Sequence, residues 1–182
     1  MVQSIFCTTA FAAALSLTPC LSVAQEVFGT LTASLDGIQR SWFLTAHEGE
    51  SQSFGLTVSI ANLQSFSMWG QPSAYDVQTM QDSLLLSFDV MSVGDQVIPL
   101  NMSVTYLENG WASGWVSDDP ENIVFALTTL KKSDAGVLIE GSFDTVASYG
   151  EPLSHGATDA SRTMLINGSF HATLPPGLLN TQ

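Results

Sequence analysis

Apolar and polar residues alternate with a period of two through most of the chain after residue 26. In VFGTLTASLD, residues 27–36, the side chains of Leu31, Ala33 and Leu35 fall on one face of an extended strand, and small polar residues fall on the other. This alternation predicts half-buried β-strands. It predicts about nine of them, at 27–36, 38–46, 53–62, 83–90, 97–107, 111–117, 122–130, 136–147 and 161–174.

The turns between these strands carry suitable residues. Asp36-Gly37 is a typical two-residue hairpin turn, and a short helical turn is expected only around 74–82. Many short strands at near-regular spacing predict one all-β domain over residues 25–182. We expect an antiparallel β-sandwich or a closed β-barrel.

One nine-residue pattern occurs twice in the chain, as VLIEGSFDT at 137–145 and MLINGSFHA at 164–172. Each copy has a glycine inside a strand, and a phenylalanine follows two positions later. Glycine inside a strand marks a bend or a close backbone approach. We therefore interpret the repeat as two neighbouring long strands, with the large residue filling the space that the glycine leaves, and not as a duplicated chemical site.

An uncharged apolar stretch at residues 4–24 precedes the domain, and it ends in the small residues of Ser22-Val23-Ala24. This pattern predicts a signal peptide over residues 1–24, with cleavage before Gln25. The alternatives are an uncleaved anchor and lipid attachment at Cys20. Pro19 disfavours both a stable membrane span and a lipobox.

Both cysteines, Cys7 and Cys20, lie inside the predicted signal peptide. The exported domain is therefore expected to have no disulfide, and we expect it to be secreted or periplasmic.

The composition is strongly acidic, with 17 Asp and Glu against four Lys and Arg and a net charge of −13. Nucleic acids and anionic membrane surfaces both require clustered basic residues. The four bases are scattered along the chain, so we expect neither partner.

Two terminal motifs, GTLTASLDGIQRSWF at 29–43 and INGSFHATL at 166–174, resemble uncharacterised secreted proteins of Gram-negative bacteria. Those proteins begin G-T-L-T-A-x-x-D-G and end G-x-F-x-A-x-L. The resemblance implies a β-sandwich or calycin-like domain in the bacterial envelope, and it implies no activity.

Four aromatic residues are candidates for ligand binding. Trp69 and Tyr75 fall in a long predicted connection, 65–76, and such loops often carry binding function. Trp111 and Trp115 fall four positions apart on one predicted strand, hence on one face, where core packing is the competing interpretation.

The acidic segment SDDPEN, residues 117–122, is the best candidate for a cation site. Asp118, Asp119 and Glu121 supply hard oxygen ligands that suit calcium. The D-x-D-x-D-G spacing is missing, and Asp and Pro are also ordinary turn residues.

No catalytic residue is assigned. The three histidines are His47, His155 and His171. A grouping of Ser154, His155 and Asp159 can be drawn, but the chain contains no G-x-S-x-G turn. Gly-rich phosphate loops are also absent, so no organic cofactor is expected.

These observations predict a secreted or periplasmic, non-catalytic protein that acts by binding or interaction. One alternative is a calycin-like carrier with a small apolar ligand inside the domain. A second alternative is a hydrolase of unknown substrate, which would require several of the histidines and acids to converge.

Overall fold

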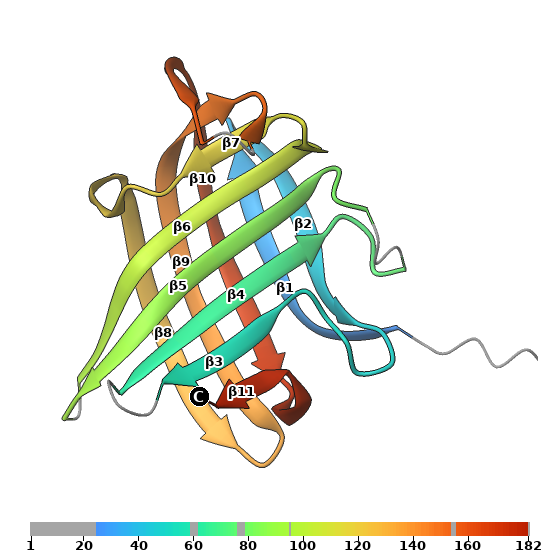
Figure 1. The fold of residues 1–182 in the computed structure, drawn as a ribbon, viewed down its shortest axis with the longest axis vertical. Helices are drawn as coiled ribbons and strands as arrows, with labels where there is room; N and C mark the ends of the chain where they lie inside the picture. Colours follow the sequence, from blue (N-terminus) through green and yellow to red (C-terminus); the bar gives the residue numbers. More distant parts are fainter. Residues whose placement is uncertain (1–24, 59–61, 76–78, 95, 154–155, 182) are drawn as a thin grey trace, which may run out of the picture.

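The computed structural model of the chain describes residues 25–58, 62–75, 79–94, 96–153 and 156–181 (Figure 1). The predicted signal peptide and His155 lie outside these residues. Eleven β-strands and two short 3-10 turns, η2 (Pro120–Asn122) and η4 (Pro176–Leu178), make up the described fold. The strands are β1 (Glu26–Leu35), β2 (Ile38–Ala46), β3 (Phe54–Val58), β4 (Leu63–Gln71), β5 (Ser83–Val93), β6 (Gln96–Trp111), β7 (Gly114–Ser117), β8 (Ile123–Ser133), β9 (Gly136–Gly150), β10 (Thr158–Leu174) and β11 (Leu179–Thr181).

All eleven strands belong to one hydrogen-bonded sheet, in the order β11-β3-β4-β2-β1-β10-β9-β7-β6-β5. β8 pairs with β9 beside this path, and β4 pairs with β5 as well as with β2. Every pairing is antiparallel except that of β11 with β3. The prediction of an all-β domain is confirmed in this form.

The nine strands expected from the alternation are all present, and β4 and β11 were missed. β4 occupies most of the stretch that we expected to be a long connection, so Trp69 lies on a strand and not in a loop. The expected helical turn at 74–82 is wrong for its described part, where residues 74–75 form a bend, residues 79–80 are irregular and residues 81–82 form a turn. The β1–β2 hairpin is confirmed, because Asp36 and Gly37 have φ of 48° and 89°, as a type I′ turn requires.

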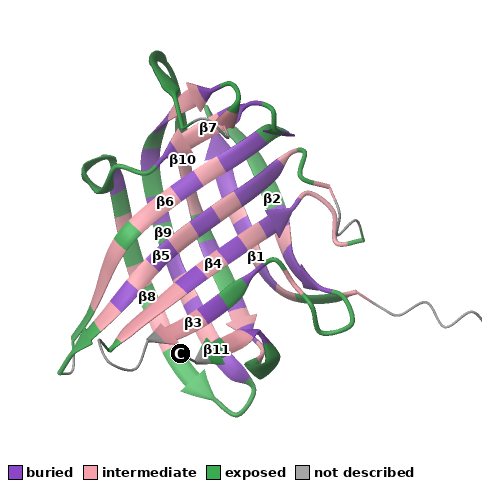
Figure 2. Cartoon of the chain, viewed as in Figure 1, coloured by how far each residue is buried: buried purple, intermediate pink, exposed green. Residues whose placement is uncertain are grey.

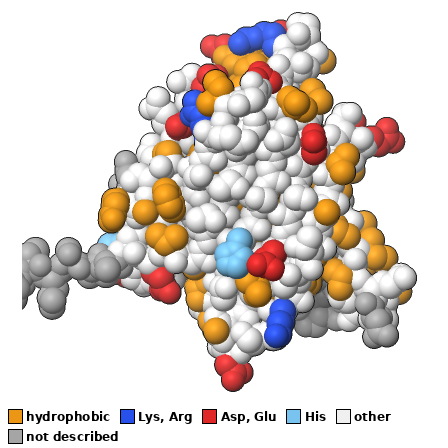
Figure 3. All heavy atoms as spheres, turned by 180° about the vertical axis from the view of Figure 1, so that it is seen from behind, with side chains coloured by type: hydrophobic (Ala, Val, Ile, Leu, Met, Phe, Trp, Pro, Cys, Tyr) orange, Lys and Arg blue, Asp and Glu red, His pale blue; other side chains and the backbone are white. Residues whose placement is uncertain are grey.

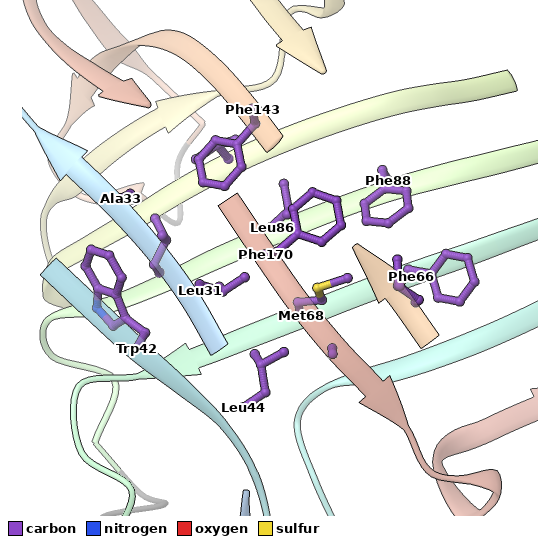
Figure 4. Packing of buried hydrophobic residues seen from close by; sticks show 14 of the residues in the cluster. Leu31, Ala33, Trp42, Leu44, Phe66, Met68, Leu86, Phe88, Phe143 and Phe170 are labelled. Atoms are coloured by element: carbon purple, nitrogen blue, oxygen red, sulfur yellow. The ribbon is translucent and has the colours of Figure 1, made fainter. Parts of the chain in front are cut away.

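Alternate residues of the strands form one continuous core (Figure 2). Leu31, Leu44, Met68, Leu84 and Leu86 are each 0% exposed. Figure 4 shows Phe66, Phe88 and Phe170 grouped on one side of this core and Trp42 on the other. The alternation seen in the sequence is therefore the inward–outward alternation of the sheet.

Aromatic rings fill the part of the core near β8. The ring centroid of Phe88 lies 4.8 Å from that of Phe125 and 5.7 Å from that of Phe170. Phe125 and Phe170 stack with centroids 5.5 Å apart and an interplanar angle of 21°. Offset contacts of this kind stabilise a core beyond simple burial.

The repeated pattern lies on the neighbouring strands β9 and β10, as predicted. In their antiparallel register, Gly141 faces Phe170 and Gly168 faces Phe143. A Cβ on Gly141 would overlap the ring of Phe170, and a Cβ on Gly168 would lie 2.9 Å from the ring of Phe143. Each phenylalanine thus fills the space over the glycine of the other strand, so the filling is reciprocal between strands.

Gly141→Ala should lower the free energy of unfolding by about 1–3 kcal/mol, because the added methyl overlaps both the Phe170 ring and the Ala126 carbonyl oxygen. Gly177→Ala is the matched control, since no atom lies within 4 Å of its added methyl. We expect the control to change the free energy by less than about 0.5 kcal/mol. Equal stability of the two variants in chemical denaturation would contradict the reciprocal packing.

Candidate functional site

The connection between β9 and β10 is held on the outer face of the sheet by Leu153. Gly114 of β7 and Gly150 of β9 are direct partners in the register. A methyl carbon of Leu153 lies 3.0 Å from the position of a Cβ on Gly114, and the other lies 2.8 Å from that of Gly150. This glycine pair therefore makes the seat in which Leu153 packs, at the end of the molecule that is uppermost in Figure 1.

Beside this seat is a half-enclosed cavity of about 250 Å³, which we call the Trp111 pocket. Its floor includes Thr105 of β6 and Val116 of β7, which are partners in the sheet. Trp111, at the end of β6, forms part of its wall and is 44% exposed. The lining residues are Thr105, Trp111, Val116, Asp118, Leu153, Gly156, Ala157 and Thr158.

Trp69 supports the wall from β4. The Trp69 and Trp111 rings meet edge to face, with centroids 6.0 Å apart and an interplanar angle of 72°. With the amide oxygen of buried Gln71 facing the indole, Trp69 Nε1 donates to that oxygen over 2.9 Å, and the Gln71 nitrogen donates to the Thr79 carbonyl over 2.6 Å. These bonds fix the Trp69 ring against which Trp111 rests.

The other two predicted aromatic residues lie elsewhere. Tyr75 is 92% exposed and follows the end of β4. Trp111 ends β6 and Trp115 lies on β7, with residues 112–113 between the two strands. The prediction that both residues share one strand is therefore wrong. The Trp115 ring packs edge to face on Tyr149, with centroids 5.2 Å apart.

Arg162 of β10 covers this Trp115–Tyr149 pair. Its guanidinium carbon lies 3.4 Å from the Tyr149 ring centroid and 5.9 Å from that of Trp115. Glu151 and Asp159 line the same surface hollow. Hydrogen bonds from the Ser161 hydroxyl, at 2.6 Å, and backbone N–H, at 2.9 Å, lower the pKa of Asp159, which favours its charged form.

Arg40 of β2 makes a second contact between a guanidinium group and an aromatic ring. Its guanidinium carbon lies 5.8 Å from the Tyr106 ring centroid. The Asp82 carboxylate accepts hydrogen bonds from Arg40 and from the Tyr106 hydroxyl. Burial, reinforced by the bond to Asp82, raises the pKa of Tyr106 well above its ordinary value.

The acidic segment 117–122 takes the form of a capped turn. One carboxylate oxygen of Asp119 accepts from the Glu121 backbone N–H at 3.0 Å, and the other accepts from the Asn122 side chain at 3.0 Å. Asp119 is thus the N-cap of η2. Among the described residues, no group of three or more His, Cys, Asp or Glu side chains is placed to hold a metal ion.

The described histidines are surface residues. His171 Nδ1 lies 2.7 Å from a carboxylate oxygen of Glu140, with 60% of its side chain exposed. Hydrogen bonds from Thr129 and His171 lower the pKa of Glu140. His171 pairs with Glu140 and Asp159 pairs with Tyr149, and these partners are about 30 Å apart along β9 at the rise of an extended strand. His171 and Asp159 therefore do not share a site.

Comparisons with protein-family models, curated proteins and solved structures find no match to this chain. Within the described residues, no helix has the length and apolarity needed to cross a bilayer. Of the seven residues predicted to bind a ligand or a metal, the fold brings Trp69, Trp111 and Asp118 together at the Trp111 pocket. Sequence reasoning missed Thr105, Val116 and Leu153, since their approach depends on the β6–β7–β9 register.

Asp119→Ala should lower the free energy of unfolding by about 1 kcal/mol, because the variant loses the N-cap of η2. This loss is measured in the presence of chelator, where no bound cation contributes to the stability of either protein. The calcium site stays a prediction, and these melts also test it. If calcium raises the melting temperature of the wild type but not of Asp119→Ala, the segment binds the ion.

Proposed function

We propose that the chain is an exported, non-catalytic binding protein of the bacterial envelope, which takes a small ligand in the Trp111 pocket. The observation that carries this proposal is the pocket itself: a half-enclosed cavity with an aromatic wall, built on paired strands. Its lining combines apolar side chains with threonine hydroxyls and one carboxylate, and concave sites that join apolar surface to placed polar groups are typical of small-molecule binding. The predicted signal peptide supports export.

We further propose that the sheet is a closed barrel. The pairings run β4–β2–β1–β10–β9–β7–β6–β5, and β5 pairs again with β4. A closed ring would leave few free edges and would hold the pocket on a rigid wall. Rigid elements position binding groups more accurately than loops do.

The lining of the pocket favours binding over catalysis. Asp118 is the one titratable side chain among its described lining residues. General acid–base chemistry and nucleophilic catalysis are commonly carried out by groups that cooperate within hydrogen-bond reach. A single carboxylate beside an indole ring can recognise a ligand, and the described lining gives it no second titratable group.

The expected partners remain small molecules or other proteins. Of the four basic residues, Arg40 and Arg162 already lie over aromatic rings of the chain. On the face seen in Figure 3, basic side chains stand at separate positions, and the two upper ones lie beside acidic side chains. This distribution supports the expectation that neither nucleic acid nor an anionic membrane is the partner.

Native mass spectrometry of residues 25–182, purified from the host's own envelope fraction, tests the binding function. We expect a bound mass that is lost in Trp111→Leu and retained in Tyr75→Ala, an exposed aromatic control outside the pocket lining. A bound mass retained equally in both variants would place the ligand elsewhere. A bare polypeptide in all three proteins would contradict the proposal.

A carrier of an apolar ligand is the second candidate, and a groove between β6 and β8 favours it. β6 pairs with β7 at residues 104–106, whereas β8 pairs with β9. Between the first half of β6 and β8 lies a groove of about 340 Å³. It reaches the core through Phe125, and it is lined by Val97, Pro99, Phe125, Leu127, Thr128, Thr129 and Leu130.

The neutral dye N-phenyl-1-naphthylamine tests this second candidate, because its fluorescence rises in apolar surroundings. A carrier should bind the dye, and Val97→Glu should abolish binding by placing a charge in the groove. Val93→Glu is the matched control, since Val93 is 52% exposed, Val97 is 45% exposed, and Val93 does not line the groove. Absence of a fluorescence rise with the wild type would dismiss the carrier function.

A further inference from the structure

We propose that the ligand of the Trp111 pocket is a small organic cation of the alkylammonium class, held between the Trp111 indole and the Asp118 carboxylate. This inference rests on the proposed function, since it names the class of ligand that the pocket binds. The same end of the molecule holds two of its own arginines with the same combination of groups, an aromatic ring and a carboxylate.

The first of these internal cation sites holds Arg40. Its guanidinium lies over the Tyr106 ring and is hydrogen-bonded to the Asp82 carboxylate. Arg40 Nη1 also donates to the Tyr106 hydroxyl over 3.0 Å. An aromatic ring and a carboxylate together hold the cation.

The second internal site holds Arg162. Its guanidinium lies 3.4 Å from the Tyr149 ring centroid. The carboxylates of Glu151 and Asp159 line the same hollow, and Tyr149 donates from its hydroxyl to Glu151 over 2.9 Å. Here too a ring and nearby carboxylates surround one positive group.

The Trp111 pocket has the same combination of ring and carboxylate, and no Lys or Arg is among its described lining residues. Trp111 supplies the ring and Asp118 supplies the carboxylate. All four Lys and Arg residues lie in the described part of the chain, and none of them lines this pocket. Arg162 lies in the neighbouring hollow, which shares Ala157 and Thr158 with the pocket and contains its own two carboxylates.

The remaining lining suits an alkylated cation. Val116, Leu153 and Ala157 present apolar surface to alkyl groups, and the Thr105 and Thr158 hydroxyls supply polar groups beside it. A cation over an indole face gains about 0.5–2 kcal/mol, and more as it is desolvated. The net charge of −13 would also attract a cationic ligand and repel an anionic one.

The test compares choline with its uncharged carbon isostere, 3,3-dimethylbutan-1-ol, in calorimetric titrations of residues 25–182. The two probes have the same shape and hydroxyl group, so the difference reports the charge alone. We expect choline to bind at least about tenfold more tightly, with an affinity that falls as salt concentration rises.

Two variants locate the effect. Asp118→Asn should lower the choline affinity several-fold and leave that of the alcohol unchanged, because the indole still attracts the cation. Trp111→Leu should abolish binding of both probes. Asp144→Asn removes the same charge from the outer face of β9, outside the pocket lining, and should retain at least half of the wild-type affinity. Agreement of all three variants with these expectations supports the inference.

Three outcomes would overturn it. Equal affinity for the two probes, lost in Trp111→Leu, would show that the pocket binds a ligand without recognising its charge. The proposed binding function would then stand, and the proposal of a cationic ligand would be rejected. Choline binding unaffected by Trp111→Leu and Asp118→Asn would place the cation elsewhere. No choline binding at millimolar concentrations would also reject this ligand class, while the bound mass in native spectrometry would still decide the binding function.

Discussion

Two phenylalanine rings, each packed over a glycine of the neighbouring strand, hold β9 and β10 together at the centre of the sheet. Because Gly141 and Gly168 have no side chains, Phe170 and Phe143 occupy the space over them inside the core. The rest of the sheet is assembled on these two strands. β1 pairs with the edge of β10 that faces away from β9, and both β7 and β8 pair with β9.

This central pair also determines where the candidate site lies. β9 ends in Gly150, which faces Gly114 of β7, and this second glycine arrangement seats Leu153 on the outer face. Leu153 and the 156–158 segment line the pocket together with Trp111 and the paired residues of β6 and β7. Two pairs of glycines thus shape the fold. Gly141 and Gly168 admit phenylalanine rings in the core, and Gly114 and Gly150 admit Leu153, which anchors the connection that borders the pocket.

Most of the fold could be predicted from the sequence, because alternation directly reports which residues face inward. β4 was missed although Phe66 and Met68 alternate with small polar residues, since Gly70 and Pro72 at its end are typical of a loop. The parallel pairing of the three-residue β11 with β3 leaves no periodic pattern in so short a segment.

The site could be predicted only in part. Trp69 and Trp111 were chosen individually, but their contact joins β4 to the end of β6, two strands that do not pair with each other. Such a contact depends on the folded sheet and leaves no local pattern in the sequence. The capping role of Asp119, in contrast, could have been read from the sequence, because an Asp directly before a Pro is a typical start of a helical turn.

The reciprocal glycine–phenylalanine packing is most directly tested by nuclear Overhauser spectroscopy of residues 25–182 with labelled glycine and phenylalanine. We expect cross-peaks from the Gly141 Hα protons to the ring of Phe170, and from the Gly168 Hα protons to the ring of Phe143. Cross-peaks that instead join Gly141 to Phe143 and Gly168 to Phe170, within each strand, would contradict the packing on which this account of the fold depends.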